Sequence, residues 1–164
     1  MGLSAVYPGS FDPITSGHLD IVRRGSELFE AFHLLIAYND GKDHMFSGES
    51  RERIVRRTVE AMDCDPVVSL HRGLTDDYIV DHAIDVLIRG LRNGDDLRYE
   101  MELEEYFQKT TDVEVVYMTP QSEHLKTSST VVRRFLDADH PEKTTDYLHP
   151  VTYDQIRAIR AEHE

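Results

Sequence analysis

Three segments of this 164-residue chain carry side chains that can bind phosphate groups. The first, residues 7–18 with the sequence YPGSFDPITSGH, follows a short apolar run and contains Ser10 and His18. A turn is expected to begin at Pro8, and Gly9 would allow a backbone geometry that a side chain blocks. A helix is expected to start near His18, so free N–H groups, a positive dipole end and the imidazole would face an anion. The segment therefore predicts a phosphate-binding corner between a strand and a helix.

The second segment, residues 88–100 with the sequence IRGLRNGDDLRYE, follows another predicted strand. Arg89 and Arg92 leave the end of that strand three residues apart, close to Gly90. Two guanidinium groups in this position can hold phosphate oxygens with paired hydrogen bonds. The alternative is a charged loop in which the arginines pair with acidic residues of the same segment, such as Glu100.

The third segment, residues 127–133 with the sequence TSSTVVR, places three hydroxyl side chains at the predicted start of a helix. They belong to Ser128, Ser129 and Thr130. Hydroxyl residues at this position are ordinary N-caps, and the same geometry offers hydroxyl and N–H groups to a phosphate. Arg133 lies one turn into the helix, on a face that can reach the same oxygens.

Apolar runs bounded by turns alternate with helical patterns along the chain. We expect strands at residues 3–7, 33–38, 66–70, 86–88 and 113–118, and helices at residues 17–30, 50–62, 75–83, 95–109, 128–137 and 152–162. This alternation predicts an α/β fold with a doubly wound, five-stranded parallel sheet in a single domain, residues 1–164. Ligands of such sheets bind where the strands end. Lys42 follows the second strand and is expected at this edge, although a lone lysine on a loop is usually solvated.

The composition argues against several classes of protein. The formal net charge of −13 speaks against non-specific nucleic-acid binding, which needs a basic surface. No apolar run approaches the ~20 residues that span a bilayer, and no secretory signal is visible. The single cysteine, Cys64, excludes an intrachain disulfide and agrees with a cytoplasmic location. The acidic balance fits either an adaptation to high salt or an ordinary acidic enzyme.

The three segments resemble motifs of one enzyme family. Residues 7–18 resemble the T/H-x-G-H signature of the nucleotidyltransferase superfamily, in the form found in bacterial-type phosphopantetheine adenylyltransferases. Residues 88–100 are similar to the RGLRxxxDxxYE motif of that family, and residues 127–133 to the superfamily motif ISSTxxR, with Thr127 in place of isoleucine. The resemblance covers nearly the whole chain. It implies a Rossmann-like nucleotidyltransferase fold and adenylyl transfer from ATP to 4′-phosphopantetheine, giving dephospho-CoA and pyrophosphate in coenzyme A biosynthesis.

The resemblance also implies roles for single residues. The catalytic residues would be His18, Lys42, Ser10 and Arg92. ATP would contact Gly9, Ser10, Phe11, His18, Gly90, Arg92, Glu100, Ser128, Ser129 and Thr130. The acceptor would contact Ser10, Lys42, Leu74, Thr75 and Arg89. No dedicated metal-ligand cluster is visible, so Mg²⁺ is expected to arrive with ATP; the family further implies a homohexamer and CoA as a feedback ligand.

The chain departs from the family on the acceptor side. Phe107 stands where relatives carry an asparagine that contacts the pantetheine arm, and Arg133 and Arg134 replace the usual Lys-Glu pair. Either the arm packs on Phe107, or Phe107 turns into the core or a subunit contact. Two other functions remain as alternatives: a related small nucleotidyltransferase with a different phosphorylated acceptor, such as a glycerol phosphate cytidylyltransferase, and a non-catalytic module that binds nucleotide or CoA.

Overall fold

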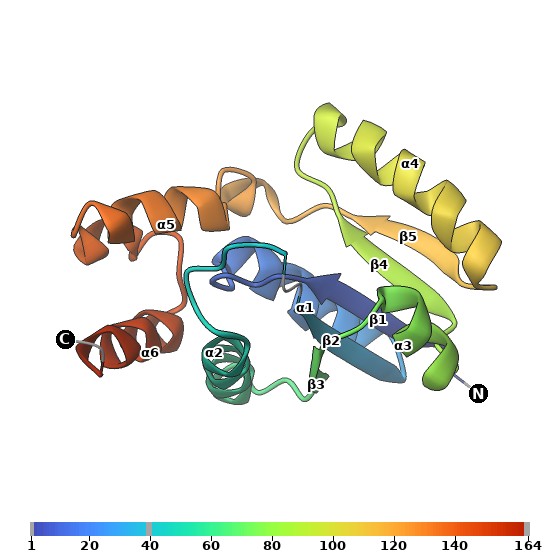
Figure 1. The fold of residues 1–164 in the computed structure, drawn as a ribbon, viewed down its shortest axis with the longest axis horizontal. Helices are drawn as coiled ribbons and strands as arrows, with labels where there is room; N and C mark the ends of the chain where they lie inside the picture. Colours follow the sequence, from blue (N-terminus) through green and yellow to red (C-terminus); the bar gives the residue numbers. More distant parts are fainter. Residues whose placement is uncertain (1, 39–40, 163–164) are drawn as a thin grey trace.

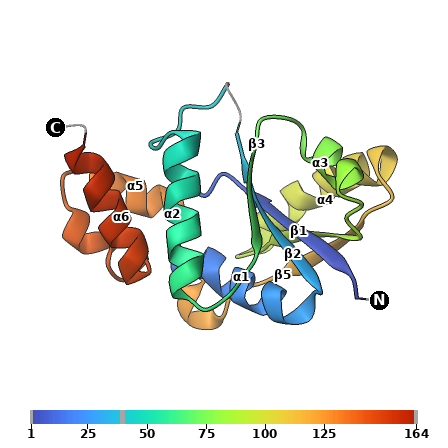
Figure 2. The same ribbon diagram turned by 90° about the horizontal axis from the view of Figure 1, so that it is seen from below.

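The computed structural model describes residues 2–38 and 41–162, which form a parallel sheet covered by helices (Figures 1 and 2). The strands are β1 (Ser4–Gly9), β2 (Ala31–Ala37), β3 (Val67–His71), β4 (Val86–Gly90) and β5 (Glu114–Met118). The helices are α1 (Ser16–Leu28), α2 (Gly48–Ala61), α3 (Thr75–Asp81), α4 (Gly94–Thr110), α5 (Ser129–Asp137) and α6 (Pro150–Ala161). Short 3₁₀ turns span Ser122–His124 and Pro141–Thr144. Every predicted strand and helix is confirmed, with each end within about two residues of its expected position.

The sheet has the strand order β3-β2-β1-β4-β5, and every neighbouring pair is parallel. The chain builds outward from β1 through β2 to β3, and then returns to the other side of β1 for β4 and β5. The predicted doubly wound sheet is therefore confirmed. The order reverses between β1 and β4, and a crevice at the carboxyl ends of these two strands is where such sheets bind ligands.

Strand β1 runs further than its sequence predicts. Pro8 and Gly9, expected in a turn, continue the strand beside Leu35 and Ile36 of β2. Proline is tolerated here because the pairing of β1 with β4 stops at Val6, so the missing N–H of Pro8 falls beyond it. The strand is thus extended on one side only, and it delivers the following loop directly to the crevice.

Glycine is required at position 9 for a reason other than the expected one. None of the described glycines has a left-handed φ, whereas Phe11 does, with φ 45°. A Cβ on Gly9 would lie 2.8 Å from Cζ of the Phe11 ring. Gly9 therefore makes room for the ring of Phe11, which folds back over the end of β1.

Two apolar cores lie on opposite faces of the sheet, because successive strand residues point to opposite sides. On β1, Ala5 and Tyr7 belong to the first core and Val6 belongs to the second. The first core also takes residues from α1, α2, α5 and α6, whereas the second takes residues from α3 and α4. Helices therefore cover both faces, with α1 and α2 on one side and α3 and α4 on the other (Figure 1).

Phe107 of α4 is part of the second core. Its side chain is 7% exposed and packs in the cluster that contains Val6, Leu87 and Val113. Of the two alternatives for this departure from the family, the core position is confirmed. Packing of the acceptor arm on Phe107 is wrong, because the ring has almost no surface left to offer a ligand.

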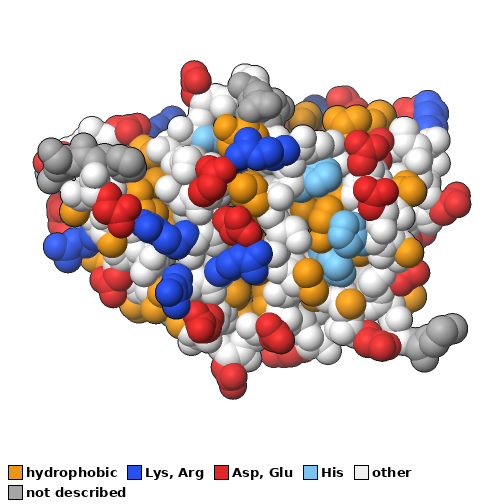
Figure 3. Space-filling model, turned by 60° about the horizontal axis from the view of Figure 1, so that its bottom comes forward, with side chains coloured by type: hydrophobic (Ala, Val, Ile, Leu, Met, Phe, Trp, Pro, Cys, Tyr) orange, Lys and Arg blue, Asp and Glu red, His pale blue; other side chains and the backbone are white. Residues whose placement is uncertain are grey.

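Charges of both signs are interspersed on the face shown in Figure 3. Three arginines of α2 form ion pairs with glutamates: Arg53 with Glu162 at 3.2 Å, Arg56 with Glu52 at 2.7 Å, and Arg57 with Glu60 at 3.4 Å. Exposed pairs of this kind contribute at most about 1 kcal/mol each.

No helix within residues 2–38 and 41–162 is both long and apolar enough to cross a membrane.

The burial of Phe107 makes a prediction about stability. The Phe107→Asn substitution should lower the free energy of unfolding by about 3–5 kcal/mol, as for aromatic truncations in a core, because a cavity forms and an amide is buried. Urea or thermal unfolding measures the loss. The control is Leu28→Asn at the end of α1, where the side chain is 69% exposed and the change should be about 0.5 kcal/mol or less. A Phe107→Asn protein as stable as the control would contradict the core assignment.

Candidate active site

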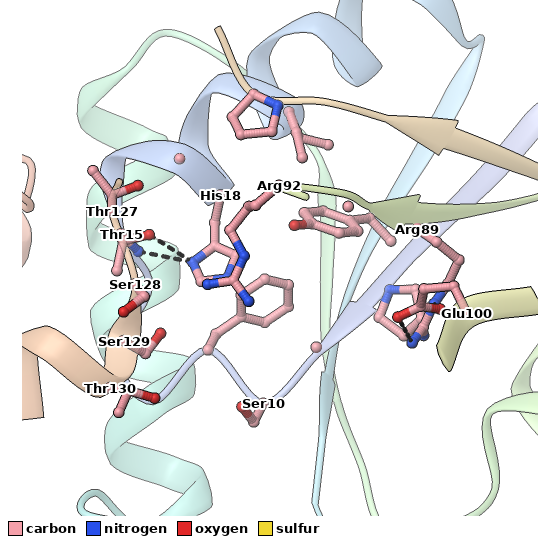
Figure 4. A pocket seen from close by; sticks show the side chains of 18 of the residues that line it. Ser10, Thr15, His18, Arg89, Arg92, Glu100, Thr127, Ser128, Ser129 and Thr130 are labelled. Atoms are coloured by element: carbon pink, nitrogen blue, oxygen red, sulfur yellow. Dashed lines mark hydrogen bonds and ion pairs between the residues drawn. The ribbon is translucent and has the colours of Figure 1, made fainter. Parts of the chain in front are cut away.

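A cavity of about 300 Å³ opens at the carboxyl ends of β1 and β4 (Figure 4). All three predicted segments contribute to it, through Gly9, Ser10, Phe11, His18, Arg89, Gly90, Arg92, Glu100, Ser128, Ser129 and Thr130. The structure therefore brings together residues that are more than a hundred positions apart in the sequence. The cavity lies where the strand order reverses, as expected for a doubly wound sheet.

The loop after β1 is held in place by arginines from two helices. Nη1 of Arg51, on α2, donates a hydrogen bond to the carbonyl oxygen of Ser10 at 2.6 Å. Nη1 of Arg133, on α5, donates to the carbonyl oxygen of Asp12 at 2.6 Å. Phe11 lies between these anchors in its left-handed conformation, which a bulky residue adopts only when its surroundings fix it. The loop is therefore pre-formed before any ligand arrives.

The side chain of Asp12 fixes a second connection. Its carboxylate is almost fully buried and accepts hydrogen bonds from the backbone N–H groups of Met45 at 2.8 Å and Phe46 at 3.0 Å. These residues belong to the connection between β2 and α2, which also carries Lys42. The loop after β1 and the connection that bears Lys42 are therefore tied together.

His18 lies in the first turn of α1, with a defined tautomer. The backbone N–H of Thr15 donates to Nδ1 of His18 at 3.1 Å, and the Thr15 hydroxyl lies 2.9 Å from the same nitrogen (Figure 4). Because Nδ1 accepts, the proton of the neutral ring resides on Nε2. Burial, reinforced by the charge of Arg92, lowers the pKa of His18 to about 4. His18 is therefore a neutral hydrogen-bond donor near pH 7.

The two arginines of the second segment are paired with acidic residues. Nε and Nη2 of Arg89 donate to the two carboxylate oxygens of Glu100 at 2.5 and 2.9 Å, and both side chains are largely buried. Arg92 donates to Asp96 from Nε at 3.3 Å and from its backbone N–H at 3.0 Å. The pairing expected as the alternative is thus present. Arg89 and Arg92 nevertheless line the cavity, and the Glu100 pair uses only two of the five N–H donors of Arg89.

All three hydroxyls at the start of α5 have protein partners. Ser128 is the N-cap, and its Oγ accepts a hydrogen bond from the Val131 N–H at 3.2 Å. Ser129 Oγ donates to the Pro13 carbonyl oxygen at 2.8 Å, and Thr130 Oγ1 accepts from Arg133 at 3.2 Å. The N-cap role is therefore confirmed. For an anion, this helix start chiefly offers first-turn N–H groups and its dipole, and α1 begins at the same cavity.

Several lining residues were not among the predicted site residues. They are Tyr7, Pro8, Thr15, Gly17, Ile21, Pro120 and Thr127. Arg133, which the sequence predicts to reach the same oxygens as the α5 hydroxyls, also lines the cavity. A Cβ on Gly17 would lie 2.5 Å from Oγ1 of Thr127, so α1 and the segment before α5 touch at this point. The sequence shows only a glycine beside His18, which allows another group to approach closely there. That this group is Thr127 follows from the fold alone.

Three predicted residues lie outside the described lining of the cavity. Lys42 is exposed in the connection after β2, and its neighbours Asn39 and Asp40 lie outside the described residues. Leu74, the N-cap of α3, is 60% exposed, and Thr75 begins that helix. All three follow β2 or β3 at the same edge of the sheet, so their roles toward an acceptor remain predictions.

Comparison with known proteins places the chain in a family. The sequence model of the cytidylyltransferase-like family matches residues 6–135. The phosphopantetheine adenylyltransferase of Thermotoga neapolitana is 35% identical over 156 residues, which is 93% of this chain and 96% of that protein. The chain belongs to the phosphopantetheine adenylyltransferase family. A second member of this family, from Streptococcus pneumoniae, is 39% identical over 132 residues, covering 80% of this chain and 82% of its own.

Solved structures show the fold of this adenylyltransferase family member. A provisionally assigned nicotinate-nucleotide adenylyltransferase from Vibrio parahaemolyticus superposes with a TM-score of 0.68 at 15% identity, covering 96% of this chain and 93% of that one. TmcAL from Thermotoga maritima, solved with alpha-thio ATP, has a TM-score of 0.66 at 11% identity, covering 99% and 56%. The predicted Rossmann-like nucleotidyltransferase fold is thereby confirmed.

The environment of His18 makes a prediction about its titration. Two-dimensional ¹⁵N NMR of the imidazole should show the Nε2–H tautomer and a pKa of about 4, well below the ordinary 6.5. Between these values the unfolded chain binds a proton that the folded chain does not, so the free energy of unfolding should fall as the pH falls from 6.5 toward 4. Thr15→Ala, which keeps the backbone donor to Nδ1, should keep the tautomer. A proton on Nδ1 at pH 7 would contradict the assignment.

Proposed function

We propose that this protein transfers the adenylyl group of ATP to 4′-phosphopantetheine, giving dephospho-CoA and pyrophosphate in coenzyme A biosynthesis. The observation that carries the proposal is the cavity at β1 and β4, where a neutral imidazole donor, two arginines and the starts of two helices converge. These are groups for binding and polarising phosphates. Membership in the family supports this choice of reaction and substrates.

The proposed reaction needs alignment and charge stabilisation more than proton transfer. An oxygen of the acceptor phosphate forms a bond to the α-phosphorus of ATP, and the bond from that phosphorus to the bridging oxygen of pyrophosphate breaks. The nucleophile is already an anion, so no general base and no covalent enzyme intermediate are required. The protein has to overcome repulsion between two anions, hold them in line and stabilise the charge that passes to pyrophosphate.

The nucleotide side of the cavity offers groups for this task. His18 would donate from Nε2 to an oxygen of the α-phosphate as its charge develops. Arg92 and the first-turn N–H groups of α5, from Ser129 and Thr130, would hold the β- and γ-phosphates. Ser128 would act through the cap that keeps this helix start in place. His18 and the start of α5 are held by hydrogen bonds within the protein before ATP binds, which is the condition for electrostatic stabilisation without reorganisation.

The acceptor side is assigned to residues of the neighbouring strand ends. Ser10 and Lys42 would orient the acceptor phosphate against the α-phosphate, and Arg89 would bind the acceptor phosphate while Glu100 holds its guanidinium. Leu74 and Thr75 would contact the arm of the acceptor beyond the cavity. An arginine that is already oriented by a carboxylate loses less entropy on binding a phosphate than a mobile lysine does.

Magnesium ion is proposed as a companion of ATP. Within residues 2–38 and 41–162, no cluster of three or more His, Cys, Asp or Glu side chains could hold a metal ion. Among the described residues that line the cavity, Glu100 alone carries a carboxylate, and Arg89 engages it. These residues fit an ion held by phosphate oxygens and water, which is the usual mode for Mg²⁺ in nucleotide sites. When bound, the ion would neutralise charge on the phosphate chain.

A homohexamer and a cytoplasmic location are proposed on the family resemblance. The surface of α4 supports self-association: Phe107 is the one buried residue of its described length, whereas Tyr99 and Met101 are 60% and 59% exposed. Contiguous apolar patches at a protein surface mark interaction sites, and these side chains of α4 are proposed to contribute to one. CoA, which extends the proposed product by one phosphate, is proposed as a feedback ligand of the same cavity.

The reaction is tested directly with purified protein. With Mg²⁺ and ATP it should release one pyrophosphate for each dephospho-CoA formed from 4′-phosphopantetheine, and mass spectrometry identifies the product. CTP with glycerol phosphate, the substrates of the alternative nucleotidyltransferase, should give at least ~100-fold less pyrophosphate, a difference of roughly 2.7 kcal/mol in transition-state stabilisation. Turnover of that pair alone would support the alternative enzyme, and tight nucleotide binding without turnover would support a non-catalytic module.

His18→Ala should lower kcat by roughly 10²–10³-fold and change the KM for ATP far less, as for loss of a preorganised oxyanion donor. The imidazole is expected to act mainly as charge develops, so its loss appears in the rate. Steady-state kinetics at saturating acceptor measures both constants. His140→Ala, which removes a half-exposed histidine paired with Glu142 at the surface, is the control and should leave both constants unchanged. A kcat for His18→Ala within threefold of wild type would contradict the role.

A further inference from the structure

One arginine of α2 differs from the others of this helix. Arg51 has 0% of its surface exposed, whereas Arg53, Arg56 and Arg57 form ion pairs at the surface. Within the described part of the chain, no carboxylate forms an ion pair with Arg51; Asp12 and Glu49 influence it only through their charge. Burying an unpaired cation costs several kcal/mol, and an apolar side chain of similar length would fill the same space without that cost. Arg51 is therefore a feature that packing alone does not explain.

The contacts of Arg51 are to backbone oxygens at the ends of two neighbouring strands. Its Nη1 donates to the carbonyl oxygen of Ser10 at 2.6 Å and to that of Ala37 at 3.2 Å. Ser10 follows β1, and Ala37 is the last residue of β2, from which the connection to Lys42 departs. One guanidinium thus spans the two points from which the proposed acceptor-phosphate residues, Ser10 and Lys42, leave the sheet.

The rest of the guanidinium lies in a buried, polar environment. Nε and Nη2 of Arg51 are buried without a hydrogen-bond partner within residues 2–38 and 41–162, as is Nε2 of His44 in the connection that bears Lys42. The ring of Tyr38 lies 5.6 Å from the guanidinium carbon and accepts its charge through its face. Asp12 and Glu49 offset part of this charge without forming an ion pair with it within the described residues, and the remaining positive charge at low dielectric favours an anion near Ser10.

The nucleotide side of the same loop is anchored differently. Arg133 and Ser129, both on α5, hold the carbonyl oxygens of Asp12 and Pro13 at 2.6 and 2.8 Å. The loop after β1 therefore has two independent sets of anchors, one from α2 at Ser10 and one from α5 beyond Phe11. A change at Arg51 should disturb the first set and leave the second in place.

We propose that Arg51 is a positioning residue for the acceptor: its buried guanidinium fixes Ser10 and the end of β2, so that the acceptor phosphate is held in line with the α-phosphate of ATP. The proposal rests on the proposed adenylyl transfer. Displacing a reacting group by about 1 Å can cost 100-fold in rate, so an anchor of this kind acts on catalysis without touching a substrate.

Two substitutions test the proposal. Arg51→Lys keeps the charge but replaces the guanidinium fork by a single ammonium, and Arg51→Met keeps the length but removes every donor. We expect kcat/KM for 4′-phosphopantetheine to fall about 10-fold in Arg51→Lys and about 100-fold in Arg51→Met, with the KM for ATP within twofold of wild type. If Arg51→Met does not fold, Arg51→Lys alone decides.

Thr58→Val is the matched control for stability. Thr58 lies on the same helix, is fully buried, and its hydroxyl pairs with that of Thr152 at 2.9 Å on α6, away from the cavity. It should lower the melting temperature and leave the kinetic constants unchanged. Three results would each overturn the proposal and leave Arg51 a structural residue: wild-type kinetics in Arg51→Lys, a KM for ATP that rises as much as the KM for 4′-phosphopantetheine, or a Thr58→Val protein with the same acceptor defect.

The outcome is separable from that of the proposed function. If wild-type protein does not turn over 4′-phosphopantetheine, the proposed adenylyl transfer is wrong. The positioning role of Arg51 is then tested by NMR instead of by activity. In that case the backbone amide NMR signals of Ser10 and Phe11 should shift strongly in Arg51→Lys and remain in place in Thr58→Val. Unshifted signals in Arg51→Lys would overturn the positioning role as well.

Discussion

The structure depends on the capture of backbone carbonyl oxygens in the loop that follows the central strand. The buried Asp12 and Pro13, and the more exposed Ser10 before them, each present a carbonyl oxygen that accepts a hydrogen bond from a side chain of another element. A buried carbonyl without a donor costs about 1–3 kcal/mol, so these bonds fix where α2 and α5 pack. The cavity exists because the same three bonds that satisfy the loop also bring both helices to its edge.

Charge is arranged locally, against the overall balance of the molecule. A chain with a net charge of −13 repels polyanions at long range, yet the cavity collects Arg89, Arg92, Arg133 and the positive ends of α1 and α5. Glu100 neutralises part of this charge and orients Arg89. The electrostatic field inside the cavity comes mainly from these few groups, because solvent and salt screen the exposed acidic residues beyond about 8–10 Å. His18 adds a donor that carries no charge, because burial keeps its pKa low.

Local patterns of the sequence determine the strands, the helices and the three segments of the site, because apolar periodicity, turn residues and strand ends are visible within a few positions. What the sequence does not show depends on contacts between distant residues. Pairing with β2 overrides the turn expected at Pro8. Burial of Phe107 follows from the packing of α4 on the sheet, and the contact of Gly17 with Thr127 joins residues 110 positions apart. The anchoring role of Arg51 is likewise not visible in the sequence. Its partners are backbone carbonyl oxygens, which every residue has, so no residue type marks the positions that it contacts.

The spread of the loop anchors along the chain ties the ligand site to the completion of the domain. The bonds to Ser10, Asp12 and Pro13 come from residues 51, 133 and 129, so the site has its full geometry only when most of the chain has been synthesised and folded. During synthesis from the N-terminus, the loop after the first strand therefore lacks its α5 contacts until nearly all of the chain has been made. Conversely, a nucleotide that binds this cavity binds only the completely folded domain. Its binding free energy therefore stabilises the whole domain against unfolding and against proteolysis.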